Sequence, residues 1–124
     1  MGRERASAYV PRPLTAEERQ VAEQAIRDMV DRIVRDFDPL KVILFGSFAR
    51  GDVTYDSDVD LLVVLPHVEN KREMRVAIRR ALRRAPVAKD IIVTTPEEIE
   101  RRGDIVGTIL RPALREGVTL YERG

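Results

Sequence analysis

The stretch from Lys41 to Val64 limits the fold most strongly, because two apolar runs lie within it on either side of a polar segment. Residues 42–45 run into a Gly-Ser pair, and residues 61–65 follow directly on an Asp-Val-Asp triplet. Short uninterrupted apolar runs of this kind are typical of strands that are buried on both faces. The sequence therefore predicts an α/β (α+β) fold, a small mixed sheet flanked by helices.

The Gly-Ser pair, Gly46 and Ser47, marks a tight turn between the first strand and a helix start. Glycine adopts backbone angles closed to other residues and allows a ligand to approach the main chain. Ser47 can cap the following turn, and its hydroxyl lies beside N–H groups that have no helical partner. This pattern predicts a cradle for phosphate groups.

Two aspartates, Asp58 and Asp60, stand at the entrance of the second strand. Residues two apart on a strand share a face and lie about 6.6 Å apart. At an effective dielectric near 20, two such charges repel by roughly 2.5 kcal/mol. A divalent cation offsets this repulsion, and Mg²⁺ is commonly held by one or two carboxylates together with substrate phosphates.

A third carboxylate, Asp90, begins another apolar run at residues 91–93. A neighbouring strand could bring it onto the face that carries Asp58 and Asp60. Three aspartates opposite a Gly-Ser turn could hold one or two metal ions against a nucleoside triphosphate.

The same residues resemble the signature of the minimal nucleotidyltransferases of the DNA polymerase β-like superfamily. The resemblance rests on Gly46-Ser47, Arg50-Gly51, Ser57 and Asp58-Val59-Asp60, with ten residues between Ser47 and Asp58, and on Asp90 at a later strand. It implies the nucleotidyltransferase fold, ATP as nucleotide donor and two Mg²⁺ ions. It also implies that Asp58, Asp60 and Asp90 hold the metals and act in catalysis, while Gly46, Ser47 and Arg50 bind the nucleotide phosphates.

Many members of this family are antitoxins paired with HEPN-domain toxins. The resemblance implies transfer of AMP to a protein acceptor, a tyrosine of such a toxin, which would neutralise it. Two alternatives remain open at this point. The protein could be a non-catalytic antitoxin that blocks its partner by complex formation, or a subunit that modifies a small molecule of the aminoglycoside type.

The rest of the chain supplies helices and two further strands. Thr15 and Glu18 form a capping box for a helix that runs to about Asp36, and Asp38-Pro39 ends it. Further helices are expected at about 70–85, at 96–102 and across 105–114, where Pro112 should kink or split the helix. Gly103 should end the second of these, and a last strand is expected at 118–121.

Length and composition limit the number of domains and the classes of function that are possible. The 124 residues predict one domain at 14–124, preceded by a flexible N-terminal arm at 1–13. The net charge of +1 gives no general attraction to nucleic acid, so direct nucleic-acid binding is not expected. The absence of cysteine excludes thiolate sites and disulfides. No stretch predicts a signal peptide or a membrane span, so we expect a cytoplasmic protein, which could form an oligomer with its partner.

Four features have a simple structural interpretation beside the functional one. Arg50 could form a salt bridge with Asp52 or Asp56 instead of binding phosphate, and Ser57 is expected to stabilise a turn. His67, the sole histidine, is expected at a surface turn outside the site. The helix at 70–85 carries a basic outer face that is either a solvated surface or a docking face for an acidic partner or RNA; its members are Lys71, Arg72, Arg75, Arg79, Arg80, Arg83 and Arg84.

Overall fold

The computed structural model describes residues 11–102 and 110–124. In chain order the elements are α1 (Ala16–Phe37), β1 (Lys41–Phe45), α2 (Ser47–Arg50), β2 (Val59–Val64), α3 (Lys71–Ala81), β3 (Lys89–Thr94), α4 (Pro96–Arg102), α5 (Leu110–Glu116) and β4 (Val118–Glu122). Within the described residues, no helix is both long enough and apolar enough to cross a bilayer. The α/β class expected from the sequence is confirmed.

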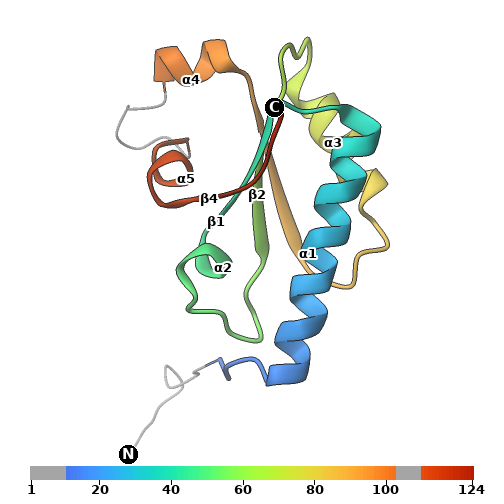
Figure 1. Cartoon of the computed structure of the whole chain (residues 1–124), viewed down its shortest axis with the longest axis vertical. Coiled ribbons are helices and arrows are strands. Elements are labelled where there is room, and N and C mark those ends of the chain that lie inside the picture. The colour runs from blue at the N-terminus through green and yellow to red at the C-terminus, as the bar shows by residue number, and fades with distance from the viewer. Residues whose placement is uncertain (1–10, 103–109) are drawn as a thin grey trace, which may run out of the picture.

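The four strands form one mixed sheet in the order β3-β2-β1-β4. β1 runs antiparallel to both β2 and β4, whereas β2 and β3 are parallel. Helices α1 and α3 cover one face of this sheet, and α4 and α5 lie on the other (Figure 1). The result is a layered domain with the two central strands buried on both sides.

Alternation along the strands produces two apolar clusters. Leu44, Leu61 and Ile91 face α1 and α3, where they pack with fully buried side chains such as Ile33. The intervening residues of the same strands face α5, where Leu110 and Ala113 cover them; these are Ile43, Phe45, Leu62 and Val64. Because side chains alternate in a strand, a continuous apolar run fills both layers.

The end of α3 differs from the prediction, since the helix stops at Ala81 rather than near Ala85. The N–H groups of Leu82, Arg83 and Ala85 bond to carbonyls three residues earlier, which tightens the chain into turns. Pro86 follows, and a residue before proline disfavours the helical conformation. The basic face predicted over 70–85 therefore lies partly on a helix and partly on this turn.

The expected helix across 105–114 is only partly described. Leu110–Glu116 forms α5, which contains Pro112. Gly103 and residues 105, 106 and 109 lie outside the described part of the chain.

Residues 11–13 of the expected N-terminal arm are described, and Arg12 and Pro13 contact the domain. The backbone of Pro13 bridges to Thr54, and the Arg12 carbonyl accepts the N–H of Tyr55 at 2.8 Å. The Arg12 guanidinium donates two hydrogen bonds of 2.8 Å to Glu18, which belongs to the capping box of α1, and lies 4.5 Å from the centre of the Tyr55 ring. These contacts tie the start of α1 to the loop that leads into β2.

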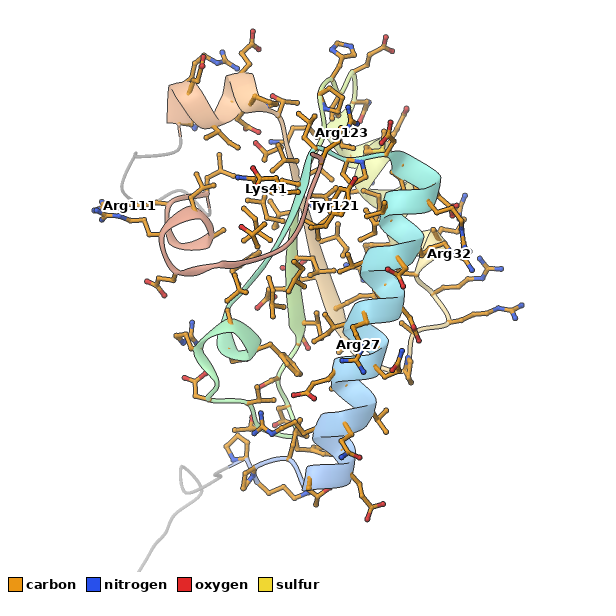
Figure 2. All side chains as sticks on the ribbon, in the orientation of Figure 1. Arg27, Arg32, Lys41, Arg111, Tyr121 and Arg123 are labelled. Atoms are coloured by element: carbon orange, nitrogen blue, oxygen red, sulfur yellow. The ribbon has the colours of Figure 1, made fainter. Side chains whose placement is uncertain are left out.

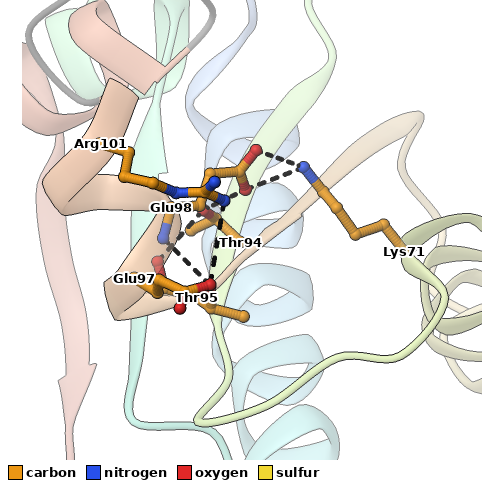
Figure 3. A network of polar contacts seen from close by, with 6 residues as sticks. All are labelled: Lys71, Thr94, Thr95, Glu97, Glu98 and Arg101. Carbon is orange, nitrogen blue, oxygen red and sulfur yellow. Dashed lines mark hydrogen bonds and ion pairs between the residues drawn. The ribbon is translucent and has the colours of Figure 1, made fainter.

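Two polar contacts fix the periphery of the sheet. Glu98 on α4 accepts hydrogen bonds from Lys71 Nζ at 2.8 Å and from the buried hydroxyl of Thr94 at 2.7 Å (Figure 3). Arg123, which follows β4 (Figure 2), pairs with Asp38 at the end of α1, with Arg123 Nη2 3.2 Å from Asp38 Oδ1. The short elements around the sheet are therefore held by charged contacts as well as by apolar packing.

Candidate active site

The predicted Gly-Ser turn joins β1 to the short helix α2. Gly46 has φ 73° and ψ −154°, and its carbonyl accepts the N–H groups of Ala49 and Arg50, both at 3.1 Å. Gly46 is thus the N-cap, and Ser47 is the first helical residue with no side-chain capping bond, which corrects the expectation that Ser47 caps the turn. The N–H groups of Ser47 and Phe48 precede the first helical hydrogen bonds, so they can face a phosphate.

Asp60 and Asp90 lie side by side on the parallel pair β2 and β3. They are register partners, and adjacent strands are about 4.8 Å apart. Asp60 also pairs with Phe45 at the end of β1, immediately before Gly46. Both aspartates belong to the strand positions that face the α5 side, like Leu62 and Ile92 further along. The predicted juxtaposition of these two carboxylates is therefore present in the fold.

Asp58 is exposed and lies one residue before β2, at the predicted entrance of the strand. A turn precedes it, in which Ser57 Oγ accepts the N–H of Thr54 at 2.9 Å and the Ser57 N–H donates to the Thr54 carbonyl at 3.0 Å. Ser57 therefore stabilises the turn, as the sequence predicted. The neighbouring Val59 N–H donates to the Ala88 carbonyl at 2.8 Å, which ties this entrance to the start of β3.

The charges of the three aspartates act on one another. Partial burial raises the pKa of Asp60, and the nearby Asp90 and Asp58 carboxylates raise it further, in that order of importance, while Arg50 opposes them. A carboxyl group whose ionised form is disfavoured in this way is stabilised by a bound cation or by protonation. Arg50 also pairs with Asp52, at 3.4 Å between Nε and Oδ2, so the predicted salt bridge is present.

Gly46 packs directly against the Asp60 carboxylate. A Cβ atom added to Gly46 would lie 2.1 Å from Asp60 Oδ2, far inside the closest approach that real Cβ atoms make. The left-handed φ and this contact both require glycine. The phosphate-facing turn and the central aspartate are consequently built as one unit.

The donor set fits Mg²⁺, although the described residues include no group of three or more His, Cys, Asp or Glu side chains gathered closely enough to hold a metal alone. Hard cations prefer carboxylate oxygens, and Mg²⁺ usually keeps open positions for water and substrate phosphates. Two register-paired aspartates, a third nearby and mutual repulsion that a cation would relieve match that mode of binding.

Two residues near the site, Arg12 and Tyr55, could not be recognised from the sequence. Arg12 and Tyr55 hold the loop that leads to Asp58, but their spacing carries no recognisable signal. His67 is exposed and lies 4.0 Å from Glu69, in agreement with a surface turn.

The geometry agrees with comparison to known proteins. A family model of the nucleotidyltransferase domain matches residues 26–115, which include Gly46, Asp60 and Asp90. The chain belongs to this family. Two presumed protein adenylyltransferases of Methanocaldococcus jannaschii are similar over a shorter stretch, at 46% identity over 44 residues and 44% over 43 residues. These matches cover 34% and 35% of this chain and 44% and 43% of the relatives, less than half of their length.

Solved structures share the nucleotidyltransferase fold. A nucleotidyltransferase-like protein of Sulfolobus solfataricus superposes with a TM-score of 0.55 at 26% identity, over 83% of this chain and 87% of that one. A toxin–antitoxin crystal structure with AMP-PNP contains a chain that superposes with a TM-score of 0.50 at 20% identity, over 77% of this chain and 73% of that one. At that identity the second likeness concerns the fold alone.

Proposed function

We propose that this protein is a Mg²⁺-dependent nucleotidyltransferase that moves AMP from ATP to a protein acceptor. The observation that carries the proposal is the packing of the Gly46 turn against Asp60, whose register partner is Asp90. A turn with open N–H groups beside paired carboxylates suits a triphosphate and its metal better than any structural role. The similarity to presumed protein adenylyltransferases supports AMP and a protein as the transferred group and the acceptor.

The reaction exchanges one phosphorus–oxygen bond for another. The acceptor hydroxyl oxygen bonds to the α-phosphorus, the bond from that phosphorus to the oxygen of the β-phosphate breaks, and pyrophosphate leaves with the electron pair. The backbone N–H groups of Ser47 and Phe48 orient the terminal phosphates, and Arg50 adds positive charge beside them. A carboxylate oxygen of Asp90 accepts the hydroxyl proton.

Asp58, Asp60 and Asp90 would hold one or two Mg²⁺ ions, which when bound neutralise the triphosphate and favour the ionised acceptor oxygen. The raised pKa of Asp60 supports this assignment, because three carboxylates that repel one another are relieved by a cation. Gly46 keeps the main chain close to Asp60, so phosphates and carboxylates converge on one space.

We further propose a tyrosine of a HEPN-family toxin as the acceptor, so that the modification neutralises the toxin. The support is the family resemblance and the shared fold with a chain of a toxin–antitoxin structure that contains AMP-PNP. A cytoplasmic location, where ATP and Mg²⁺ are abundant, fits this activity.

The test is the intact mass of the protein encoded by the neighbouring gene, after incubation with this protein, ATP and Mg²⁺. We expect an increase by whole AMP units with the wild type and none with Asp58→Asn/Asp60→Asn. An unchanged mass in the presence of a stable complex would refute the enzyme and favour the non-catalytic antitoxin. Transfer only to added aminoglycosides would favour the small-molecule alternative.

A further inference from the structure

The loop that carries Asp58 has little apolar anchorage of its own. Val53 and Val59 are buried at its two ends, whereas none of residues 54–58 between them is buried. Asp58 also precedes the ladder of β2, and its carboxylate accepts no hydrogen bond from residues 11–102 or 110–124. The position of this candidate metal ligand therefore depends on the hydrogen bonds that hold the loop on either side of it.

The middle of the loop is fastened to the segment that precedes α1. The Tyr55 N–H donates to the Arg12 carbonyl at 2.8 Å. Pro13 and Thr54 form an isolated antiparallel bridge beside this bond. Within the loop, Ser57 Oγ accepts the Thr54 N–H at 2.9 Å and the Ser57 N–H donates to the Thr54 carbonyl at 3.0 Å. The bridge thus holds a closed turn that ends immediately before the aspartate.

The side chain of Arg12 fixes the same turn to the start of α1. Its two terminal nitrogens donate to Glu18 Oε1 and Oε2, both at 2.8 Å, and its guanidinium carbon lies 4.5 Å from the centre of the Tyr55 ring. Glu18 is itself held by the capping box, in which it exchanges hydrogen bonds with Thr15. A forked pair between arginine and a carboxylate adds geometric specificity to its strength, and this pair begins at the capped end of a helix.

On the other side of Asp58, the chain is fastened to the sheet. The Val59 N–H donates to the Ala88 carbonyl at 2.8 Å, and the parallel ladder that follows sets Asp60 beside Asp90. Asp58 therefore lies between two attachments. The sheet provides one of them, and the contacts of Arg12 provide the other.

We propose that Arg12 is a positioning residue for the metal site, which holds the Asp58 carboxylate within reach of the cation that the two register-paired aspartates bind. The inference rests on the proposed function, since the cation is the one that AMP transfer requires. It assigns the end of the expected N-terminal arm to the scaffold of the active site.

Metal affinity tests this role without nucleotide, acceptor or turnover. The probe is Mn²⁺, which prefers the same carboxylate and water ligands as Mg²⁺, and EPR spectroscopy measures the free ion during a titration of the full chain. We expect Arg12→Ala to raise the Mn²⁺ dissociation constant about tenfold, because loss of an outer partner of a metal ligand costs about 10- to 100-fold in affinity. Arg12→Lys should recover only part of this loss, because lysine keeps the charge but lacks the planar fork.

Two variants serve as matched controls. Tyr55→Phe keeps the ring beside the Arg12 guanidinium and should bind Mn²⁺ like the wild type, whereas Tyr55→Ala should resemble Arg12→Ala. Arg123→Ala removes an arginine that fastens the opposite end of α1 through Asp38, and it should leave the Mn²⁺ affinity unchanged. Circular dichroism shows that each variant is folded under the conditions of the titration.

A double-mutant cycle separates positioning of Asp58 from a general structural role. In an Asp58→Asn background the positioned ligand is already impaired, so Arg12→Ala should have little further effect on Mn²⁺ binding. An equal loss of affinity in both backgrounds would overturn the proposal, because Arg12 would then act on the domain as a whole. Wild-type affinity in Arg12→Ala, or the same loss in Arg123→Ala, would overturn it as well.

AMP transfer to the protein encoded by the neighbouring gene is scored separately. Mn²⁺ binding that depends on Arg12 and Asp58 without any transfer would refute the proposed function and keep the positioning role. Transfer by the wild type, together with unchanged Mn²⁺ affinity in Arg12→Ala, would keep the function and refute the positioning role. Absence of Mn²⁺ binding by the wild type would remove the metal site and the positioning role together.

Discussion

Replacement of Gly46 by alanine tests whether the turn and Asp60 form one unit. The new Cβ would lie 2.1 Å from Asp60 Oδ2 and must move about 0.9 Å to reach 3.0 Å. In addition, φ 73° with ψ −154° is a region that essentially only glycine adopts, at a cost of about 1–3 kcal/mol for other residues. We expect Gly46→Ala to lose about 2–4 kcal/mol of unfolding free energy.

The displacement should affect activity more than folding. A catalytic group misplaced by about 1 Å can cost on the order of a hundredfold in rate. We therefore expect kcat/KM for AMP transfer to fall by about a hundredfold or more in protein that is still folded at 25 °C. Initial rates of acceptor modification, followed by intact mass, measure this, and urea unfolding measures the stability.

Gly51→Ala is the control for backbone strain. Gly51 also has a left-handed φ of 88°, but a Cβ there would meet nothing within 4 Å. It should lose about 1 kcal/mol of stability and retain activity within about threefold. Equal activity losses in the two variants, or near-normal activity in Gly46→Ala, would refute the contact with Asp60 as the reason for glycine.

Three further predictions concern electrostatics and buried hydrogen bonds. Asp60→Asn should raise the melting temperature at pH 7 without Mg²⁺, because the raised pKa of Asp60 means that its negative charge opposes folding above about pH 4. This gain in melting temperature should vanish near pH 3, where the Asp60 carboxyl is protonated. The rate of AMP transfer by Asp60→Asn should fall more than about a hundredfold. Arg12→Ala should destabilise the protein in urea at pH 6 but hardly at pH 2. The reason is that the Arg12 hydrogen bonds and the Thr15 backbone N–H lower the pKa of Glu18 from 4.5 to about 2. The stabilisation from this pair is therefore present above pH 4.5 and is lost as the pH falls towards 2. Thr94→Val should cost about 1–2 kcal/mol in urea unfolding, because it removes a buried hydroxyl that donates to the Glu98 carboxylate. An equal loss in a Glu98→Ala background, which lacks the acceptor, would contradict that origin.

Local patterns predicted most elements because their causes are local. The sequence predicted the Thr15 capping box, the helix end at Asp38 and the apolar strand runs from local patterns alone, and the structure contains each of them. The end of α3 was misjudged, because the apolar spacing continues past Ala81 while Pro86 already disfavours a helix before it. Asp58 was predicted at the entrance of the second strand, and it lies one residue before β2, outside the ladder that holds Asp60; the sequence pattern does not fix a strand's first residue.

The sequence by itself determined the chemistry available: a Gly-Ser turn, an Asp-Val-Asp triplet and a strand-initial Asp90, at a spacing shared with a known family. The tertiary structure decided which of these groups meet. Parallel pairing of β2 with β3 sets Asp60 beside Asp90, and antiparallel pairing of β1 with β2 brings Gly46 onto Asp60. Such pairings depend on the register between strands that are distant in sequence. Burial of both sheet faces under α1, α3 and α5 fixes this register, and no single residue of the sequence reveals it.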